Sequence, residues 1–87
     1  MTTYFVILAE WCIDCEAGHT ILGVYDSKED AIEVLKTRVD TDDRPLAESY
    51  GYEVYEDSET CFDSGEDGQY VTNHIYVAIE EIHTPHR

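Results

Sequence analysis

The feature that most constrains this chain is an apolar run that leads directly into a cluster of cysteine and histidine. Residues 4–9 read Tyr-Phe-Val-Ile-Leu-Ala, and residues 11–19 read Trp-Cys-Ile-Asp-Cys-Glu-Ala-Gly-His. A continuous apolar run rich in β-branched and aromatic residues predicts a central strand that is buried on both faces. Cys12 and Cys15 form a Cys-x-x-Cys pair, which is compatible with a metal-binding turn, a redox-active dithiol or two small core residues.

The first half of the chain predicts a hairpin followed by a helix. Residues 20–25 predict a second strand, so the cysteine cluster would form the tip of a hairpin, with Gly18 available for a positive φ angle. Ser27 and Asp30 have the spacing of a capping box, which predicts a helix over residues 28–39. Its apolar residues form one stripe that would pack on the sheet, namely Ala31, Ile32, Leu35 and Val39. Residues 40–45 are expected to form a charged loop.

The second half predicts further strands. Residues 52–56 alternate and predict a half-exposed strand, a turn is expected at residues 57–58, and residues 59–63 predict another short strand. Residues 64–68 have the composition of a turn. Residues 70–82 predict a long strand that places Val71, Ile75, Val77 and Ile79 on one face and Thr72, His74, Tyr76 and Ala78 on the other.

These elements predict one α+β domain over residues 1–87. It would contain an antiparallel sheet of four to five strands in β-β-α-β-β order, with a further strand at the end in the five-stranded form. One helix would pack on one face, and a zinc ion would staple the fold. A domain of this size buries little apolar surface, so a bound metal would add useful stability.

Charge is the strongest compositional signal. Twenty acidic residues stand against five basic ones, and the formal net charge is −15. Such a chain repels nucleic acid and anionic membranes and is attracted to basic surfaces. The acidity could serve solubility alone, or it could let the protein occupy a positively charged nucleic-acid groove on another protein. We expect no direct nucleic-acid binding.

The sequence also predicts a cytoplasmic location. The amino-terminal apolar run is too short for a signal peptide and has no basic region before it. No stretch approaches the roughly 18 apolar residues of a membrane span. Structural disulfides are uncommon in the cytoplasm, and the chain has three cysteines, an odd number. In a reducing compartment this pattern favours zinc.

The predicted zinc ligands are Cys12, Cys15, Cys61 and His74. Cys61 is the only remaining thiol, and pairing of Ser64 with Gln69 would place it opposite Thr72 and diagonal to His74. His19 is the alternative fourth ligand because it would face the cysteine pair across the first hairpin. His83 and His86 near the carboxyl end are weaker candidates.

Catalytic interpretations have less support. Trp11 and the Cys-x-x-Cys pair after an apolar strand resemble the active site of thioredoxin-like proteins, in which a long helix follows the motif and lowers the thiol pKa. Here Gly18 and a β-rich segment follow the motif instead of a helix. The cis-proline of thioredoxin-like proteins is also hard to place, because the only prolines are Pro45 and Pro85. There is no glycine-rich phosphate loop and no His-Glu-x-x-His motif. We therefore expect a protein that is not an enzyme.

As a whole, the chain resembles small acidic proteins of phages and their Gram-positive hosts. The resemblance lies in the apolar first strand, in the stretch Leu-Gly-Val-Tyr-Asp-Ser-Lys-Glu-Asp-Ala at residues 22–31, in an acidic turn, in Asn-His-Ile at 73–75 and in Ala-Ile-Glu-Glu-Ile at 78–82. Within that group it is similar to zinc-containing anti-CRISPR proteins that inhibit the type II RNA-guided nuclease, and Cys12 and Cys15 suggest the metal-bearing kind.

The resemblance implies a host-cell inhibitor that binds a basic surface of the nuclease and blocks target-DNA binding. Candidate aromatic anchors among the carboxylates are Tyr50, Tyr52, Tyr55 and Tyr70. For any one of them, packing in the sheet or core is the commoner role. The competing hypothesis is a small redox or metal-handling protein that uses the Cys12 and Cys15 dithiol chemically.

Overall fold

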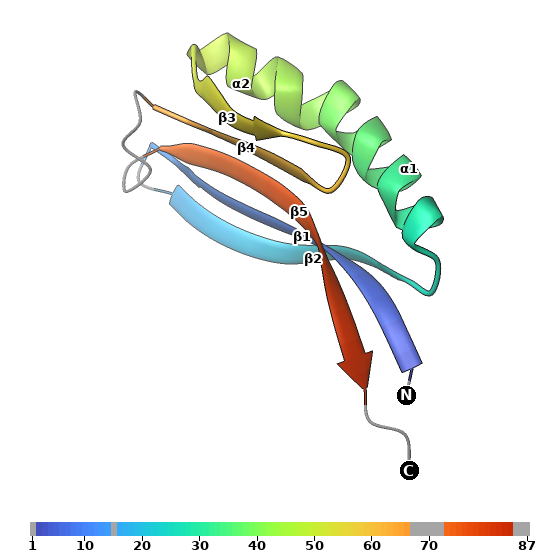
Figure 1. Cartoon of the computed structure of the whole chain (residues 1–87). Helices are drawn as coiled ribbons and strands as arrows, with labels where there is room; N and C mark the ends of the chain where they lie inside the picture. Colours follow the sequence, from blue (N-terminus) through green and yellow to red (C-terminus); the bar gives the residue numbers. More distant parts are fainter. Residues whose placement is uncertain (1, 15, 67–72, 85–87) are drawn as a thin grey trace.

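The computed structural model describes residues 2–14, 16–66 and 73–84. Two strands come first, then a continuous helical segment, then three more strands (Figure 1). The elements in chain order are β1 (Thr2–Ile13), β2 (Glu16–Tyr25), α1 (Lys28–Arg38), the π-helical turn η1 (Val39–Asp43), α2 (Arg44–Tyr50), β3 (Glu53–Asp57), β4 (Cys61–Gly65) and β5 (His74–Thr84). The strands form one sheet in the order β2-β1-β5-β4-β3, and all neighbours are antiparallel.

The α+β class, the five-stranded antiparallel sheet and the helical cover on one face are therefore confirmed. The chain has one strand more than the β-β-α-β-β order, because three strands follow the helical segment, near the predicted residues 52–56, 59–63 and 70–82. The run at residues 4–9 lies within β1, an interior strand flanked by β2 and β5. Side chains on both of its faces are buried at mid-strand, where Val6 is 6% exposed and Ile7 is fully buried.

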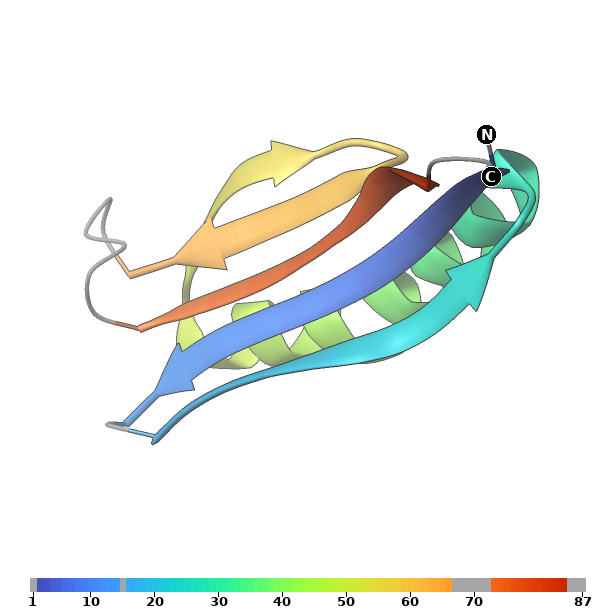
Figure 2. The ribbon, with the colours of Figure 1, turned by 90° about the horizontal axis from the view of Figure 1, so that it is seen from below.

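The helical layer covers one face of the sheet, and the core lies between the two. Figure 2 shows the opposite face, with the strands in front of the helices. Ile7, Phe62 and Val77 from the sheet and Leu35 from α1 are the largest apolar side chains that are almost completely buried. Alternation along β5 is as predicted for the described residues: Ile75 and Val77 belong to the core, and Val71 and Thr72 lie outside the described part.

Helix α1 begins as predicted, since the Ser27 hydroxyl accepts a hydrogen bond from the Asp30 amide at 3.3 Å. The charged loop expected at residues 40–45 is wrong, because η1 and α2 continue the helical segment. Its buried positions recur at every fourth residue, namely Ala31, Leu35, Val39, Asp43 and Ala47. An α-helix drifts by about 40° over four residues. The wider π turn offsets that drift and keeps the later residues facing the sheet.

The helical segment ends at Gly51, which has a φ angle of 71°. The Gly51 amide donates to the Glu48 carbonyl and the Tyr52 amide donates to the Ala47 carbonyl. This is the Schellman arrangement, which favours glycine because its left-handed position strains other residues. Pro45 lies inside this continuous helical segment, directly after the π turn, where its missing amide hydrogen removes one helical hydrogen bond.

The first hairpin is tighter than predicted. β1 extends to Ile13, which pairs with Glu16, so Asp14 and Cys15 alone connect the strands. Asp14 has a φ angle of 51°, as expected for a two-residue hairpin turn. The expectation that Gly18 supplies a positive φ is wrong, because Gly18 lies within β2 opposite Trp11. An added Cβ at Gly18 would lie 2.4 Å from the Trp11 ring, so glycine is needed there for space.

Two other turn predictions also shift. Asp57 belongs to β3, and Ser58 to Thr60 connect it to β4. Ser64 and Gly65, predicted as part of a turn, are the last residues of β4, and residues 67–72 lie outside the described part. Among the described helices, none is long and apolar enough to span a bilayer.

Candidate functional site

The face of the sheet that the helices leave uncovered carries a row of polar side chains across every strand. Glu10 on β1 pairs with His19 on β2 and with Tyr76 on β5. Tyr76 pairs with Asp63 on β4, which in turn pairs with Glu56 on β3. Directly opposite residues of an antiparallel sheet project from the same face. We call these five residues the acidic row and the face that carries them the open face.

Two residues of the acidic row, Asp63 and Tyr76, have raised pKa values. Burial raises the pKa of Asp63, and the nearby Glu56 and Glu10 raise it further, while His74 acts in the opposite direction. The pKa of Tyr76 is also raised, chiefly by burial and then by Cys61, Glu80, Asp63 and Glu10. Glu10, Asp63, His74 and Tyr76 border a shallow cavity of about 310 Å³. The row is therefore a concentrated region of negative potential at the centre of the sheet.

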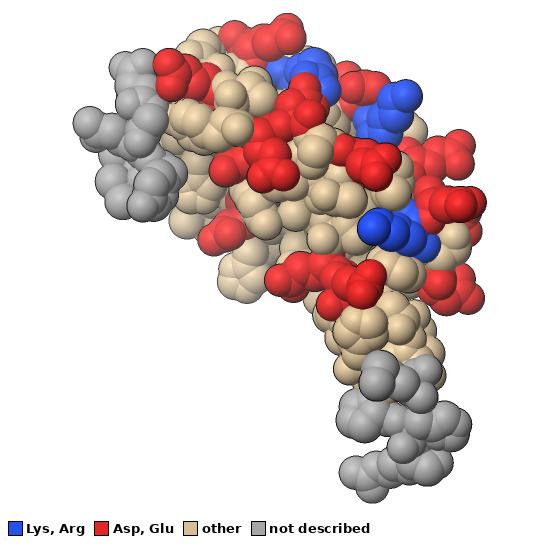
Figure 3. Space-filling view, in the orientation of Figure 1, with Lys and Arg blue, Asp and Glu red and all other residues tan. Residues whose placement is uncertain are grey.

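None of the described strands contains a lysine or arginine that could neutralise this region. The basic residues of the chain are Lys28, Lys36, Arg38, Arg44 and Arg87. The first four lie in the helical segment, where they alternate with carboxylates (Figure 3). Arg38 contacts Asp42 and Asp43, and Arg44 contacts Asp40 and Asp57. The helical layer is thus partly neutralised by its own ion pairs.

The predicted metal ligands Cys12 and His74 come together at one end of the open face. Cys12 on β1 pairs directly with His74 on β5 and, on its other side, with Ala17 on β2. The Nδ1 atom of His74 is buried and has no hydrogen-bond partner among the described residues. A buried nitrogen without a partner is costly unless another group binds it. A metal ion bound through Cys12 and His74 would satisfy that nitrogen.

The other predicted ligands have different outcomes. His19 lies two residues beyond Ala17 on β2, diagonal to Cys12, and its side chain is exposed. Cys15 is outside the described residues. In the described ranges, no three His, Cys, Asp or Glu side chains are already arranged around one metal position.

Cys61 does not lie beside His74. The predicted register of β4 and β5 is wrong, because Cys61 pairs with Ala78 and His74 pairs with Gly65. The two pairs are four positions apart along β4, a spacing of about 13 Å. Burial and the neighbouring Glu56 and Asp63 raise the pKa of the Cys61 thiol to about 11. A protonated thiol is a poor metal ligand and a poor nucleophile.

The surroundings of the cysteine pair also differ from those of a thioredoxin-like site. Strand β2 begins at Glu16, directly after the motif, where the redox proteins have a helix. Cys12 itself lies within β1. No helix amino terminus therefore faces its sulfur, and the main device that lowers a thiol pKa in such proteins is missing from the described structure.

The candidate tyrosine anchors that the structure describes lie at the end of α2 and in or just before β3. Tyr50 and Tyr52 stack at the end of α2, with ring centroids 5.3 Å apart. Tyr55 lies over Gly65, where an added Cβ would be 3.1 Å from its ring, and Tyr70 is outside the described residues. Sequence reasoning missed Tyr76 as an anchor, although it placed Tyr76 on the correct face. Alternation alone could not identify its carboxylate neighbours, which come from β1 and β4.

Comparisons with known protein families, with curated proteins and with solved structures give no match to this chain.

Proposed function

We propose that this chain is an acidic binding protein that docks through its open face onto a basic, nucleic-acid-binding surface of another protein and inhibits it. The observation that carries the proposal is the acidic row, which lies on an uncovered sheet face whose strands have no lysine or arginine. The sheet holds the backbone of these residues in place, so little backbone freedom is lost when a partner binds.

Electrostatics favours a basic protein over other partners. A net charge of −15 repels nucleic acid and anionic lipid, while it accelerates the approach of a positively charged surface. Tyr76 at the centre of the row supplies an aromatic ring among the carboxylates, a combination that suits the contact region of a protein interface. Attraction of this kind weakens as salt screens the charges.

The partner we propose is a type II RNA-guided nuclease, on the basis of the resemblance to anti-CRISPR proteins. Such nucleases hold guide and target in a positively charged channel. A protein that covers part of this channel with carboxylates would exclude the phosphates of the target DNA. The inhibitor would need no catalytic group for this action.

The test measures binding of target DNA to a guide-loaded type II nuclease in the presence of this protein. We expect inhibition at low salt that weakens as sodium chloride is added. The double variant Glu10→Gln/Asp63→Asn should weaken inhibition about tenfold or more, since it removes two charges from the contact region. The matched control Glu33→Gln/Glu48→Gln removes the same charge from the helical layer and should retain most of the activity.

The outcomes separate a specific surface from a general charge effect. Equal loss in both double variants would show that net charge alone acts, and the open face would then have no special role. Absence of inhibition at low salt would remove the nuclease as partner.

We also propose that zinc stabilises the end of the sheet that carries Cys12. Cys12, Cys15 and His74 are the proposed ligands, with His19 as the candidate for the fourth position. Bound zinc would link the tip of the first hairpin to the start of β5 and supply structural stability rather than chemistry. The directly opposed Cys12 and His74 and the unpaired Nδ1 support this assignment.

A further inference from the structure

A second cavity on the open face lies beside the acidic row, over β2, β1 and β5. Its volume is about 520 Å³, and the residues that matter for its chemistry are Leu8, Glu10, His19, Ile21, Tyr76 and Glu80. Leu8 and Ile21 are direct cross-strand partners. The Ile21 side chain is 61% exposed, so its apolar surface is open to a ligand that enters the cavity.

The cavity combines an apolar wall with carboxylates on two sides. Leu8 also pairs with Ala78 on β5, so an apolar strip formed by Ile21, Leu8 and Ala78 crosses three strands. Glu10 lies on one side of this strip and Glu80 on the other. Neither carboxylate forms an ion pair or hydrogen bond with another residue in the described part of the chain.

We propose that this cavity binds the side chain of one arginine from the basic partner. The aliphatic stem would pack on Leu8 and Ile21, and the guanidinium would reach Glu10 or Glu80 and stack on the Tyr76 ring. Arginine fits better than lysine because its planar, weakly hydrated guanidinium pairs with carboxylates through two hydrogen bonds and stacks on aromatic rings. The proposal rests on the proposed function and names the group that the open face recognises.

The chemistry of the cavity disfavours other ligands. Phosphates and nucleic-acid backbones would meet two carboxylates, and a hard metal ion would gain nothing from the apolar strip. A cationic side chain with a long aliphatic stem uses both features, because its stem covers Leu8 and Ile21 while its charge stays close to water.

The test is an NMR titration of the full-length protein with N-acetyl-arginine methylamide. We expect saturable shifts centred on the amides of Leu8, Glu10, Ile21 and Tyr76, with a dissociation constant on the order of millimolar for so small a probe. The citrulline analogue has the same shape without the charge and should bind at least tenfold more weakly. The lysine analogue should bind several-fold more weakly than arginine.

Two variants make the assignment specific. Glu10→Gln/Glu80→Gln should weaken arginine binding at least fivefold, whereas Glu33→Gln/Glu48→Gln should leave it within twofold of the unmodified protein. Equal binding of the citrulline analogue, or shifts spread evenly over the helical carboxylates, would overturn the proposal.

The titration and the nuclease assay fail independently. If the arginine probe does not bind but Glu10→Gln/Asp63→Asn still weakens inhibition, the open face binds a partner without this cavity and the inference is wrong. If the probe binds as expected and no nuclease is inhibited, the assignment of the cavity to arginine is supported and the proposed function is wrong.

Discussion

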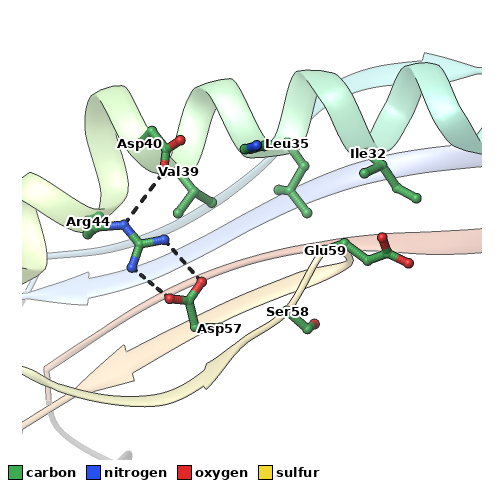
Figure 4. Close-up of a pocket in the computed structure, with 9 residues that line it drawn as sticks. Ile32, Leu35, Val39, Asp40, Arg44, Asp57, Ser58 and Glu59 are labelled. Atoms are coloured by element: carbon green, nitrogen blue, oxygen red, sulfur yellow. Dashed lines mark hydrogen bonds and ion pairs between the residues drawn. The ribbon is translucent and has the colours of Figure 1, made fainter.

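Arg44 on α2 donates two hydrogen bonds to the Asp57 carboxylate on β3, at 2.7 and 3.1 Å (Figure 4). Its guanidinium carbon lies 5.3 Å from the ring centroid of Phe62, a completely buried core residue. The pair borders a groove of about 410 Å³ between the helical layer and the β3–β4 connection. It therefore joins the start of α2 to the edge of the sheet.

The first prediction concerns this pair and its response to acid. The hydrogen bond from Arg44 is the main cause that lowers the pKa of Asp57. A carboxyl group whose pKa is lowered by folding stabilises the fold at pH values above its unfolded pKa of about 3.9. That stabilisation is lost as the pH falls through the lower pKa of the folded state. Because both side chains are more than one-third exposed, Asp57→Asn should cost only about 0.5–1 kcal/mol at pH 7.

Urea unfolding between pH 2.5 and pH 7 checks this. The difference between the unmodified protein and Asp57→Asn should shrink toward zero at the acid end. Asp26→Asn is the control, since Asp26 has no ion pair among the described residues. Similar pH curves for the two variants would show that the Arg44 pair adds nothing.

The second prediction has the opposite sign. The pKa of Asp63 is raised, so its ionised form is disfavoured in the folded protein. Protonated Asp63 therefore contributes stability to the folded protein below the unfolded pKa of about 3.9. This contribution is lost as the pH rises through the pKa that Asp63 has in the folded protein. Asp63→Asn should therefore raise the free energy of unfolding at pH 7 by roughly 0.5–1 kcal/mol, the size of a like-charge contact across a sheet.

In the same unfolding experiment, the stability advantage of Asp63→Asn should disappear well below about pH 3.9. There Asp63 is protonated in the folded and in the unfolded protein. Added salt should stabilise the unmodified protein more than the variant. A loss of stability at pH 7 would mean that Asp63 is a structural residue and that its repulsion by Glu10 and Glu56 is unimportant.

The third prediction tests the close approach of Trp11 and Gly18. Gly18→Ala should destabilise the protein by about 1–3 kcal/mol, because the new methyl group would overlap the indole ring. Trp11 is the only tryptophan, so its fluorescence spectrum should also shift. Gly51→Ala should cost about 1 kcal/mol through its positive φ angle, yet leave the spectrum unchanged because that site has open space.

The fourth prediction concerns zinc. Protein purified without added metal should contain zinc, and Cys12→Ser or His74→Ala should lower its content and its stability. Cys61→Ser should leave the zinc content unchanged, because Cys61 lies far along β4 from the proposed ligands. Elemental analysis decides the matter: no zinc in the unmodified protein, or equal loss in Cys61→Ser, would refute the assignment.

The sequence predicted those elements whose signals are local. The apolar run of β1, the cap at Ser27 and the alternation of β5 each arise within a few residues, and the structure confirms them. The segment at residues 40–45 was misread because its acidic residues and Pro45 are typical of loops. Burial of Val39 and Ala47 against the sheet overrides that local preference.

The pairing of β4 with β5 could not be predicted, because the turn composition of residues 64–68 does not give the length of the connection between the two strands. The true partner of Cys61 is Ala78 rather than Thr72, a shift of six residues along the chain. An even shift preserves the face of every side chain while it changes every neighbour. For that reason the two faces of β5 were right, yet the Cys61–His74 part of the predicted zinc site was wrong.

The arrangement of the basic residues has a consequence for how the protein meets a partner. All described lysines and arginines lie in the helical layer, and the described strands contain none. The molecule is therefore an electric dipole across its thickness as well as a net anion. Near a positively charged surface, the field exerts a torque that turns the open face inward before contact. The positions of the few lysines and arginines thus affect the orientation of the protein as it approaches a basic partner, as well as the rate of approach.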